Sequence, residues 1–313
     1  MAFDAHAVPD QSGKVFVVTG ANGGIGFEAA RVLAARRARV ILAGRDPSKL
    51  AAALASLTAE TPGAAVESVV LDLASLASVR TAAASLRERA PRIDVLVNNA
   101  GVMAIPFRQT PEGFEMQLGT NHLGHFALTG LLLSQLQAAP HARVVTVSSL
   151  LHTRGEVVFE DIPVPERYDA NRAYAMSKLA NLLFAYELDR RLVAAGSPVR
   201  SLACHPGYSA TNLQHVGPTM SGSKVRGALM SMSNSLLAQS AQMGALPTLM
   251  AASSDEVTGG DYVGPTGLFG MRGHPVRAKS SAASHDRDVA SKLWGVSERL
   301  TGVRYDLVAA KPG

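Results

Sequence analysis

Short apolar runs rich in β-branched residues alternate along this chain with segments in which apolar residues recur at helical spacing. Continuous apolar strands joined by helices indicate a parallel sheet with both faces covered. Because such crossovers are right-handed, the sheet becomes doubly wound. The chain is therefore predicted to be an α/β protein with a seven-stranded parallel sheet and helices on both faces. The expected strands are residues 14–19, 39–43, 66–71, 94–97, 143–147, 199–204 and 261–263, and the expected helices are residues 25–37, 47–57, 75–89, 114–137, 173–194 and 286–300.

The chain is expected to form one domain spanning residues 1–313, because no linker interrupts it before residue 212. Residues 212–255 lie between the sixth and seventh expected strands and are rich in Ser, Gly, Ala and Met. Methionine is flexible and polarisable and can line an adaptable apolar site. We expect this insertion to form a lid over an apolar substrate, although ordinary helix packing explains each methionine equally well. Half of the chain's ten methionines lie here: Met220, Met230, Met232, Met243 and Met250.

The composition argues against nucleic-acid binding, disulfides and a membrane span. The net charge is only +5, aromatic residues make up 5%, and no run of five basic residues occurs. The single cysteine, Cys204, excludes a disulfide within the chain and suits a reducing compartment. No uncharged apolar stretch reaches the roughly 18 residues that a bilayer span requires, and the first residues do not resemble a signal peptide. We therefore expect a cytoplasmic protein.

A glycine-rich turn follows the first expected strand and opens the first expected helix. It reads Gly20-Ala21-Asn22-Gly23-Gly24-Ile25-Gly26. Glycines permit a tight turn and let backbone N–H groups approach a pyrophosphate at a helix N-terminus. In its context of strand, turn, helix and second strand, the motif predicts a Rossmann fold that binds a dinucleotide. A tight turn in an ordinary strand–helix unit is the alternative.

The end of the second expected strand indicates which dinucleotide is bound. A ribose 2′-hydroxyl usually calls for an acidic residue here, whereas a 2′-phosphate calls for a cation. Arg45 can form a bidentate pair with phosphate, Gly44 leaves space, and Asp46 is better explained as a helix N-cap. The sequence therefore predicts NADP(H) rather than NAD(H), with a solvated surface arginine as the alternative.

A tyrosine and a lysine four residues apart, Tyr174 and Lys178, lie in the expected helix 173–194. Such residues share a helix face, and a neighbouring positive charge lowers a phenol pKa from about 10 towards a range useful for acid–base catalysis. Ser149, just after the fifth expected strand, can hold a substrate oxygen. The trio predicts proton transfer to or from an oxygen, as in alcohol–carbonyl interconversion. Two partly exposed side chains of an ordinary helix are the alternative.

These motifs resemble the short-chain dehydrogenase/reductase family over about residues 13–211. Residues 121–126 and 174–181 are most similar to its retinol dehydrogenase and WW-domain oxidoreductase branch. The resemblance implies the catalytic residues Asn121, Ser149, Tyr174 and Lys178. It implies the cofactor-binding residues Gly20, Asn22, Gly24, Ile25, Gly26, Arg45, Asp72, Leu73, Asn99, Ala100, Gly101, Tyr174, Lys178, Pro206, Gly207 and Thr211.

The resemblance further implies an oxidoreductase that interconverts an alcohol and a carbonyl. With the expected NADP(H) site and the methionine-rich insertion, we expect it to use NADP(H) and to act on a bulky, apolar small molecule. Ser149, or Ser148 as the fallback, binds the substrate oxygen, and Tyr174 transfers the proton. Lys178 binds the nicotinamide ribose and lowers the tyrosine pKa, while Asn121 positions a water. Two other functions stay open: a dinucleotide-binding regulatory or scaffold protein without turnover, and a reductase of carbon–carbon double bonds.

Two further expectations concern metals and subunits. His122 and His125 have helical spacing, with His152 not far along the chain, but no carboxylate or cysteine completes a ligand set. We therefore expect no metal. The resemblance implies a homodimer or homotetramer formed through the helices at 114–137 and 173–194.

Overall fold

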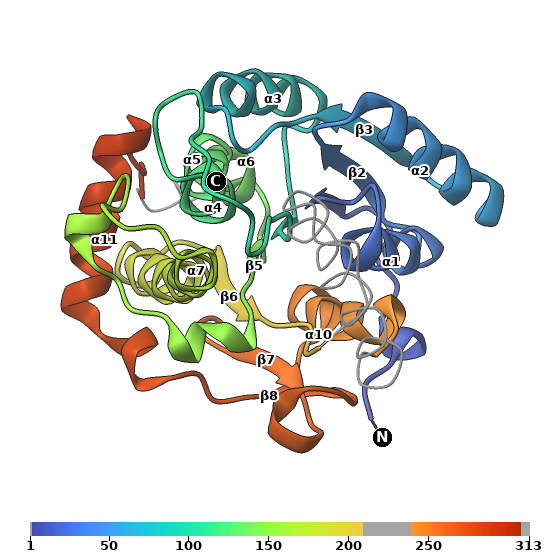
Figure 1. The fold of residues 1–313 in the computed structure, drawn as a ribbon. Helices are drawn as coiled ribbons and strands as arrows, with labels where there is room; N and C mark the ends of the chain where they lie inside the picture. Colours follow the sequence, from blue (N-terminus) through green and yellow to red (C-terminus); the bar gives the residue numbers. More distant parts are fainter. Residues whose placement is uncertain (1, 209–238, 308–313) are drawn as a thin grey trace.

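The computed structural model describes residues 2–208 and 239–307, and these contain one eight-stranded sheet (Figure 1). The strand order is β3-β2-β1-β4-β5-β6-β7-β8, and β1 to β7 pair in parallel. The order reverses direction between β1 and β4, which is where ligands bind in doubly wound sheets. The strands are β1 Val15–Thr19, β2 Arg39–Gly44, β3 Val66–Val70, β4 Val95–Asn98, β5 Arg143–Val147, β6 Arg200–Cys204, β7 Tyr262–Pro265 and β8 Pro275–Arg277.

Helices cover both faces of the sheet, as predicted. One face carries α1 Gly24–Ala35, α2 Pro47–Glu60 and α10 Ala241–Ser253. The other carries α3 Leu76–Arg89, α5 Gly124–Leu131, α6 Leu133–Gln137 and α7 Ala170–Ala194.

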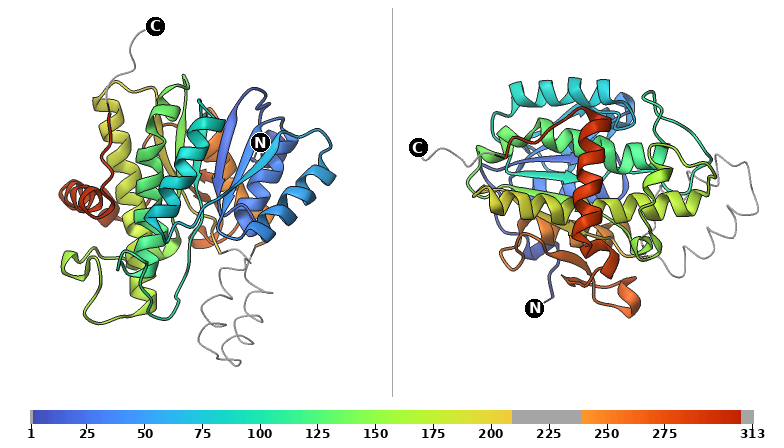
Figure 2. Two further views of the ribbon diagram at one scale, coloured as in Figure 1. Left: turned by 90° about the horizontal axis from the view of Figure 1, so that it is seen from above. Right: turned by 90° about the vertical axis from the view of Figure 1, so that its left-hand side faces the viewer.

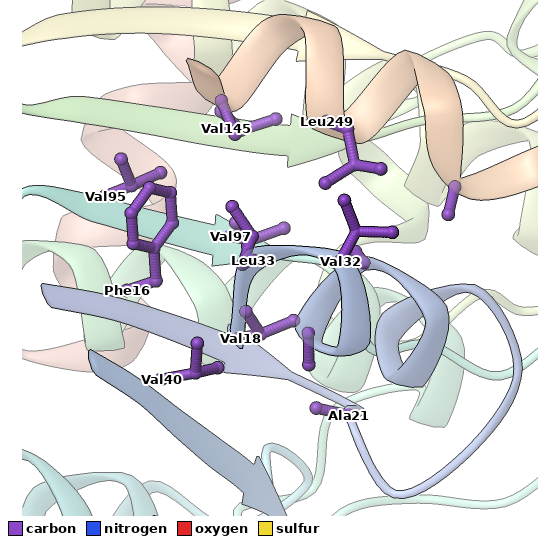
Figure 3. Packing of buried hydrophobic residues seen from close by; sticks show 14 of the residues in the cluster. Phe16, Val18, Ala21, Val32, Leu33, Val40, Val95, Val97, Val145 and Leu249 are labelled. Carbon is purple, nitrogen blue, oxygen red and sulfur yellow. The ribbon is translucent and has the colours of Figure 1, made fainter. Parts of the chain in front are cut away.

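Alternate residues of the central strands pack on opposite faces. Phe16, Val18 and Val97 point towards α1 and α10 (Figure 3), whereas Val17 and Leu96 pack on the other side. All five side chains are fully buried. Burying a side chain of this kind contributes about 1.5–3 kcal/mol, so both strands, β1 and β4, are apolar up to their last residues, Thr19 and Asn98.

The eighth strand was not predicted. β8 has three residues and pairs antiparallel with β7 at the edge of the sheet. Only Pro275 of the three is buried, and a proline is tolerated in an edge strand. A three-residue segment that begins with proline is too short to show an apolar period.

The helix expected over 114–137 is interrupted by a π-helical turn, Gly119–Leu123, which follows the short α4, Met116–Leu118. The glycines on either side allow close packing. A Cβ at Gly119 would lie 2.5 Å from Thr110 Cγ2, and one at Gly124 would lie 2.3 Å from Leu73 O. Such turns are frequent at functional sites, and this one contains Asn121.

The insertion predicted as a lid spans two different regions. Residues 212–238 lie outside the described residues, and for them the lid stays a prediction. Residues 241–253, by contrast, form α10, which packs against α1 and the sheet. Met250 is 5% exposed in that core and Met243 packs against it, so these two methionines belong to the layer that covers the sheet.

The last helix, α11 Arg287–Thr301, lies across the outer side of α5 and α7 (Figure 2). Leu293 and Trp294 are buried against these helices, and the Tyr305 hydroxyl beyond α11 donates to Phe126 O at 2.6 Å. The side of α5 and α7 that faces α11 is therefore covered by the chain itself. Among the described residues, no helix is long and apolar enough to span a bilayer.

Candidate active site at the carboxyl ends of the strands

Four central strands end beside one another and deliver most of the predicted residues to the same edge of the sheet. The glycine-rich turn follows β1, Asn99-Ala100-Gly101 follows β4, Ser149 follows β5, and Pro206-Gly207 follows β6. Because parallel strands end at a common edge, residues more than a hundred positions apart become neighbours.

Thr19, the last residue of β1, joins the first two of these segments. Its hydroxyl accepts hydrogen bonds from the backbone N–H groups of Asn99 and Ala100 at 2.9 and 3.0 Å. The Asn99 side chain donates to Thr19 O at 2.7 Å. The Asn99-Ala100-Gly101 turn is thereby held against the glycine-rich turn.

The glycine-rich turn leaves no room for side chains where it meets that segment. A Cβ at Gly26 would lie 2.5 Å from Asn99 Nδ2 and 2.6 Å from Gly20 O. Gly20 adopts a φ of +67°, in the region that favours glycine. No side chain caps the start of α1, and an uncapped helix N-terminus is suited to binding a phosphate. These features fit a dinucleotide.

At the end of β2 the structure confirms the predicted role of Asp46 as a helix cap. Asp46 caps α2 by accepting from the backbone N–H groups of Ser48 and Lys49. Arg45 is exposed, and no hydrogen bond or ion pair ties its guanidinium to the described part of the chain. A Cβ at Gly44 would lie 3.1 Å from Asn22 Oδ1, so the glycine-rich turn packs closely against the end of β2.

Ser149 and Tyr174 come together, although 25 positions separate them in the sequence. Tyr174 is 4% exposed. Burial raises the pKa of its phenol to about 12, and hydrogen bonding with the Ser149 side chain acts in the opposite direction. The Ser148 hydroxyl instead donates to Lys178 O at 2.8 Å and is 2% exposed. The geometry thus favours Ser149 over the fallback.

Lys178 is also buried, at 3% exposed. Its Nζ donates to Val147 O at 3.1 Å and lies 5.7 Å from the centroid of the Tyr174 ring. Burial lowers the pKa of this ammonium to about 8. The expectation that the lysine leaves Tyr174 with a lowered pKa is therefore wrong for the protein alone, because desolvation of the phenol is the larger effect.

Asn121 uses its whole side-chain amide within the protein. Its Oδ1 accepts from Val102 N at 2.8 Å, and its Nδ2 donates to Val102 O and to Ser177 Oγ at 3.0 and 2.9 Å. A Cβ at Gly101 would lie 3.0 Å from Asn121 Oδ1 and 3.6 Å from Lys178 Nζ. Asn121 therefore fixes the end of the Asn99-Ala100-Gly101 segment beside the lysine.

The remaining predicted residues lie around this centre. Asp72 is half-buried, and its carboxylate accepts from Ala74 N at 3.0 Å. Leu73 contacts the turn that carries Asn121, through Gly124. Gly207 has a φ of +67°, and Pro206 O accepts from Gln239 Nε2 at 2.7 Å. Thr211 lies outside the described residues.

From the sequence, His122 and His125 are weighed only as metal ligands. In the structure both rings form hydrogen bonds within the protein. His122 pairs with Ser297 Oγ, and His125 bridges Thr19 Oγ1 and Asn121 O. Burial lowers the pKa of His122 to about 3 and of His125 to about 4, so both rings are neutral. Over residues 2–208 and 239–307, no three His, Cys, Asp or Glu side chains are grouped to hold a metal.

A family model described as short chain dehydrogenase matches residues 14–220. Human retinol dehydrogenase 13 is 40% identical over 303 residues, which cover 96% of this chain and 88% of that protein. Polyprenol dehydrogenase from Danio rerio is 37% identical, with 97% of this chain and 91% of that protein covered. The crystal structure of an uncharacterized protein from Mycobacterium paratuberculosis is 43% identical and superposes with a TM-score of 0.81, covering 97% of this chain and 99% of that one.

Proposed function

This chain belongs to the short-chain dehydrogenase family, and on that premise we propose that it interconverts an alcohol and a carbonyl on an apolar substrate, with NADP(H) as the cofactor and Tyr174 as the proton-transferring group. The observation that carries the proposal is the meeting of Ser149, Tyr174 and Lys178 at the carboxyl edge of the sheet, where the Asn99-Ala100-Gly101 segment lies between the lysine and the glycine-rich turn.

Each of the three side chains has a distinct role. The Ser149 hydroxyl donates to the substrate oxygen and orients it towards Tyr174. The Tyr174 hydroxyl gives its proton to that oxygen in reduction and takes it back in oxidation. Lys178 retains two N–H groups beyond the one bonded to Val147 O, and these bind ribose hydroxyls. Asn121 holds the segment beside the lysine in place.

The cofactor rests on the glycine-rich turn, the Asn99-Ala100-Gly101 segment and the Pro206-Gly207 segment. When bound there, a nicotinamide would supply or accept the hydride. The exposed guanidinium of Arg45, without an ion-pair partner in the described ranges, suits a 2′-phosphate and supports NADP(H). Asp46 is already used as a helix cap.

An apolar alcohol as substrate is supported by the relatives, which are named for retinol and for polyprenol. The buried position of Tyr174 also favours a substrate that excludes water as it binds.

The test is the Tyr174→Phe variant, assayed with NADPH against a panel of apolar and small polar carbonyl compounds. Turnover should fall at least about 100-fold, while the dissociation constant for NADPH, measured by fluorescence titration, should change less than about threefold. Wild-type turnover in the variant would reject the proposal. Wild-type binding of NADPH without turnover of any compound would favour a regulatory protein instead.

A further inference from the structure

His152 is a buried histidine that contacts the backbone of Ser149. It is 1% exposed and lies in a 3-10 helix, Leu150–Arg154, whose N-cap is Ser149. Its Nδ1 lies 2.6 Å from Ser149 O, and its Nε2 lies 3.1 Å from Ser281 N. Resting on the function proposed above, we propose that His152 is a positioning residue that aligns the Ser149 hydroxyl with Tyr174.

The two hydrogen bonds define the protonation state of the ring. A carbonyl oxygen can only accept, so Nδ1 carries a hydrogen and donates to Ser149 O. A backbone N–H can only donate, so Nε2 is bare and accepts from Ser281. Both bonds exist together only in the neutral Nδ1–H tautomer. Burial lowers the pKa of His152, and its bond to Ser149 acts in the opposite direction.

Aromatic packing holds the ring in this orientation. The His152 ring meets the Tyr262 ring edge to face, with centroids 5.6 Å apart and an interplanar angle of 83°. Tyr262 belongs to β7, next to β6 in the sheet, and is 4% exposed. His152 therefore connects Ser149, at the end of β5, to a rigid strand and to the segment at Ser281, 129 positions further along the chain.

The alignment of the Ser149 hydroxyl depends on this anchor. Ser149 Oγ accepts from Leu151 N at 3.2 Å, and the Ser149 side chain lies near enough to Tyr174 to lower the pKa of the phenol, against the larger effect of burial. A shift of the Ser149 backbone would disturb both contacts. A displacement of about 1 Å at a reacting group can cost 100-fold in rate, so the anchor should affect turnover more than cofactor binding.

Two substitutions of His152 test its two hydrogen bonds, to Ser149 O and from Ser281 N, one at a time. The amide nitrogen of an asparagine falls near the position of Nδ1, so His152→Asn can still donate to Ser149 O. The amide of a glutamine reaches the position of Nε2, so His152→Gln can still accept from Ser281 N but loses the bond to Ser149. We expect His152→Gln to lower kcat at least about 10-fold with an unchanged KM for NADPH, and His152→Asn to keep most of the wild-type kcat. The reverse order would show that His152 serves only the Ser281 segment.

A double-mutant cycle tests whether the effect passes through Ser149. In the Ser149→Ala background, His152→Gln should have no further effect on kcat, because the hydroxyl that it aligns is gone. An equal fold-loss in both backgrounds would overturn the proposal. Leu86→Ala, a fully buried substitution in α3, is the control for destabilisation and should leave kcat unchanged.

A measurement without turnover distinguishes this proposal from the proposed function. Long-range ¹H–¹⁵N spectra of the histidine rings, assigned with His152→Gln, should show the Nδ1–H tautomer for His152 at neutral pH. An Nε2–H tautomer or an imidazolium would overturn the positioning role even if the enzyme is active. Full activity of Tyr174→Phe would reject the proposed function while leaving this spectrum as expected.

Discussion

The Nζ of Lys178 lies 5.7 Å from the centroid of the Tyr174 ring and donates its hydrogen bond to Val147 O, 3.1 Å away. The two groups share a helix face as their spacing indicated, yet both lie in a desolvated interior. The pKa of the phenol is raised to about 12 and that of the ammonium is lowered to about 8. Burial therefore shifts both equilibria towards the neutral forms, although Lys178 is still charged at pH 7, and this arrangement has measurable consequences.

Lys178→Met should stabilise the fold at pH 7 while abolishing turnover. The pKa of Lys178 in the folded state, about 8, is below its unfolded value of 10.5, so at pH values below 8 the folded protein bears the full cost of the buried charge. That cost disappears as the pH rises towards 10.5. Urea denaturation should show a gain of about 1–3 kcal/mol at pH 7 that shrinks at pH 10. Lys49→Met, exposed on α2, is the control, and a less stable Lys178→Met protein at pH 7 would contradict the argument.

Arg45→Ser should weaken NADPH binding about tenfold and leave NADH binding within about twofold, because a charge-assisted hydrogen bond to phosphate contributes about 1.5 kcal/mol or more. Titration of both cofactors into wild-type and variant protein provides the measurement. Arg37→Gln, an exposed site that pairs with Asp10, serves as the control for the loss of one positive charge. Equal weakening of both cofactors by Arg45→Ser would place the guanidinium away from the 2′ position.

Acidification should destabilise the protein through its buried histidines. His122 and His125 have folded pKa values of about 3 and 4, below the unfolded value of 6.5. Between pH 6.5 and 4 the unfolded chain therefore binds protons that the folded chain does not, and stability falls by about 1.4 kcal/mol per pH unit for each ring. His122→Gln should reduce the slope of unfolding free energy against pH by this amount. The exposed His141→Gln should leave it unchanged, and an unaltered slope in both variants would refute the neutral state of His122.

Self-association should leave the outer side of α5 and α7 unaffected, because α11 already covers it. Trp294, the single tryptophan of the chain, is 4% exposed and packs against Phe126, Phe184 and Tyr305. Amide exchange in α5 and α7 and the Trp294 emission maximum should therefore be independent of protein concentration. Slower exchange in α7 at high concentration would reveal a subunit interface there. Trp294→Ala should lower the free energy of unfolding by about 3–5 kcal/mol. Sedimentation of the folded variant shows whether its mass also changes.

The seven parallel strands and the glycine-rich turn could be predicted from the sequence because they depend on local patterns. A few neighbouring residues are enough to recognise each pattern: an apolar run, a glycine cluster at a strand end, or an i, i+4 pair. The family assigned from these motifs is confirmed by the match over residues 14–220.

Tertiary structure alone decided what depends on contacts between distant segments. The antiparallel β8 owes its place to pairing with β7, and the π-helical turn at Gly119–Leu123 begins at a glycine packed against Thr110 and is followed by one packed against Leu73. The raised pKa of Tyr174 follows from burial by many elements, which no spacing of two residues can report. In the same way His152 acquires its hydrogen bond to Ser281 only when the chain folds. Neighbouring residues determine local propensity. Desolvation and long-range hydrogen bonds, by contrast, exist only once the whole core has assembled.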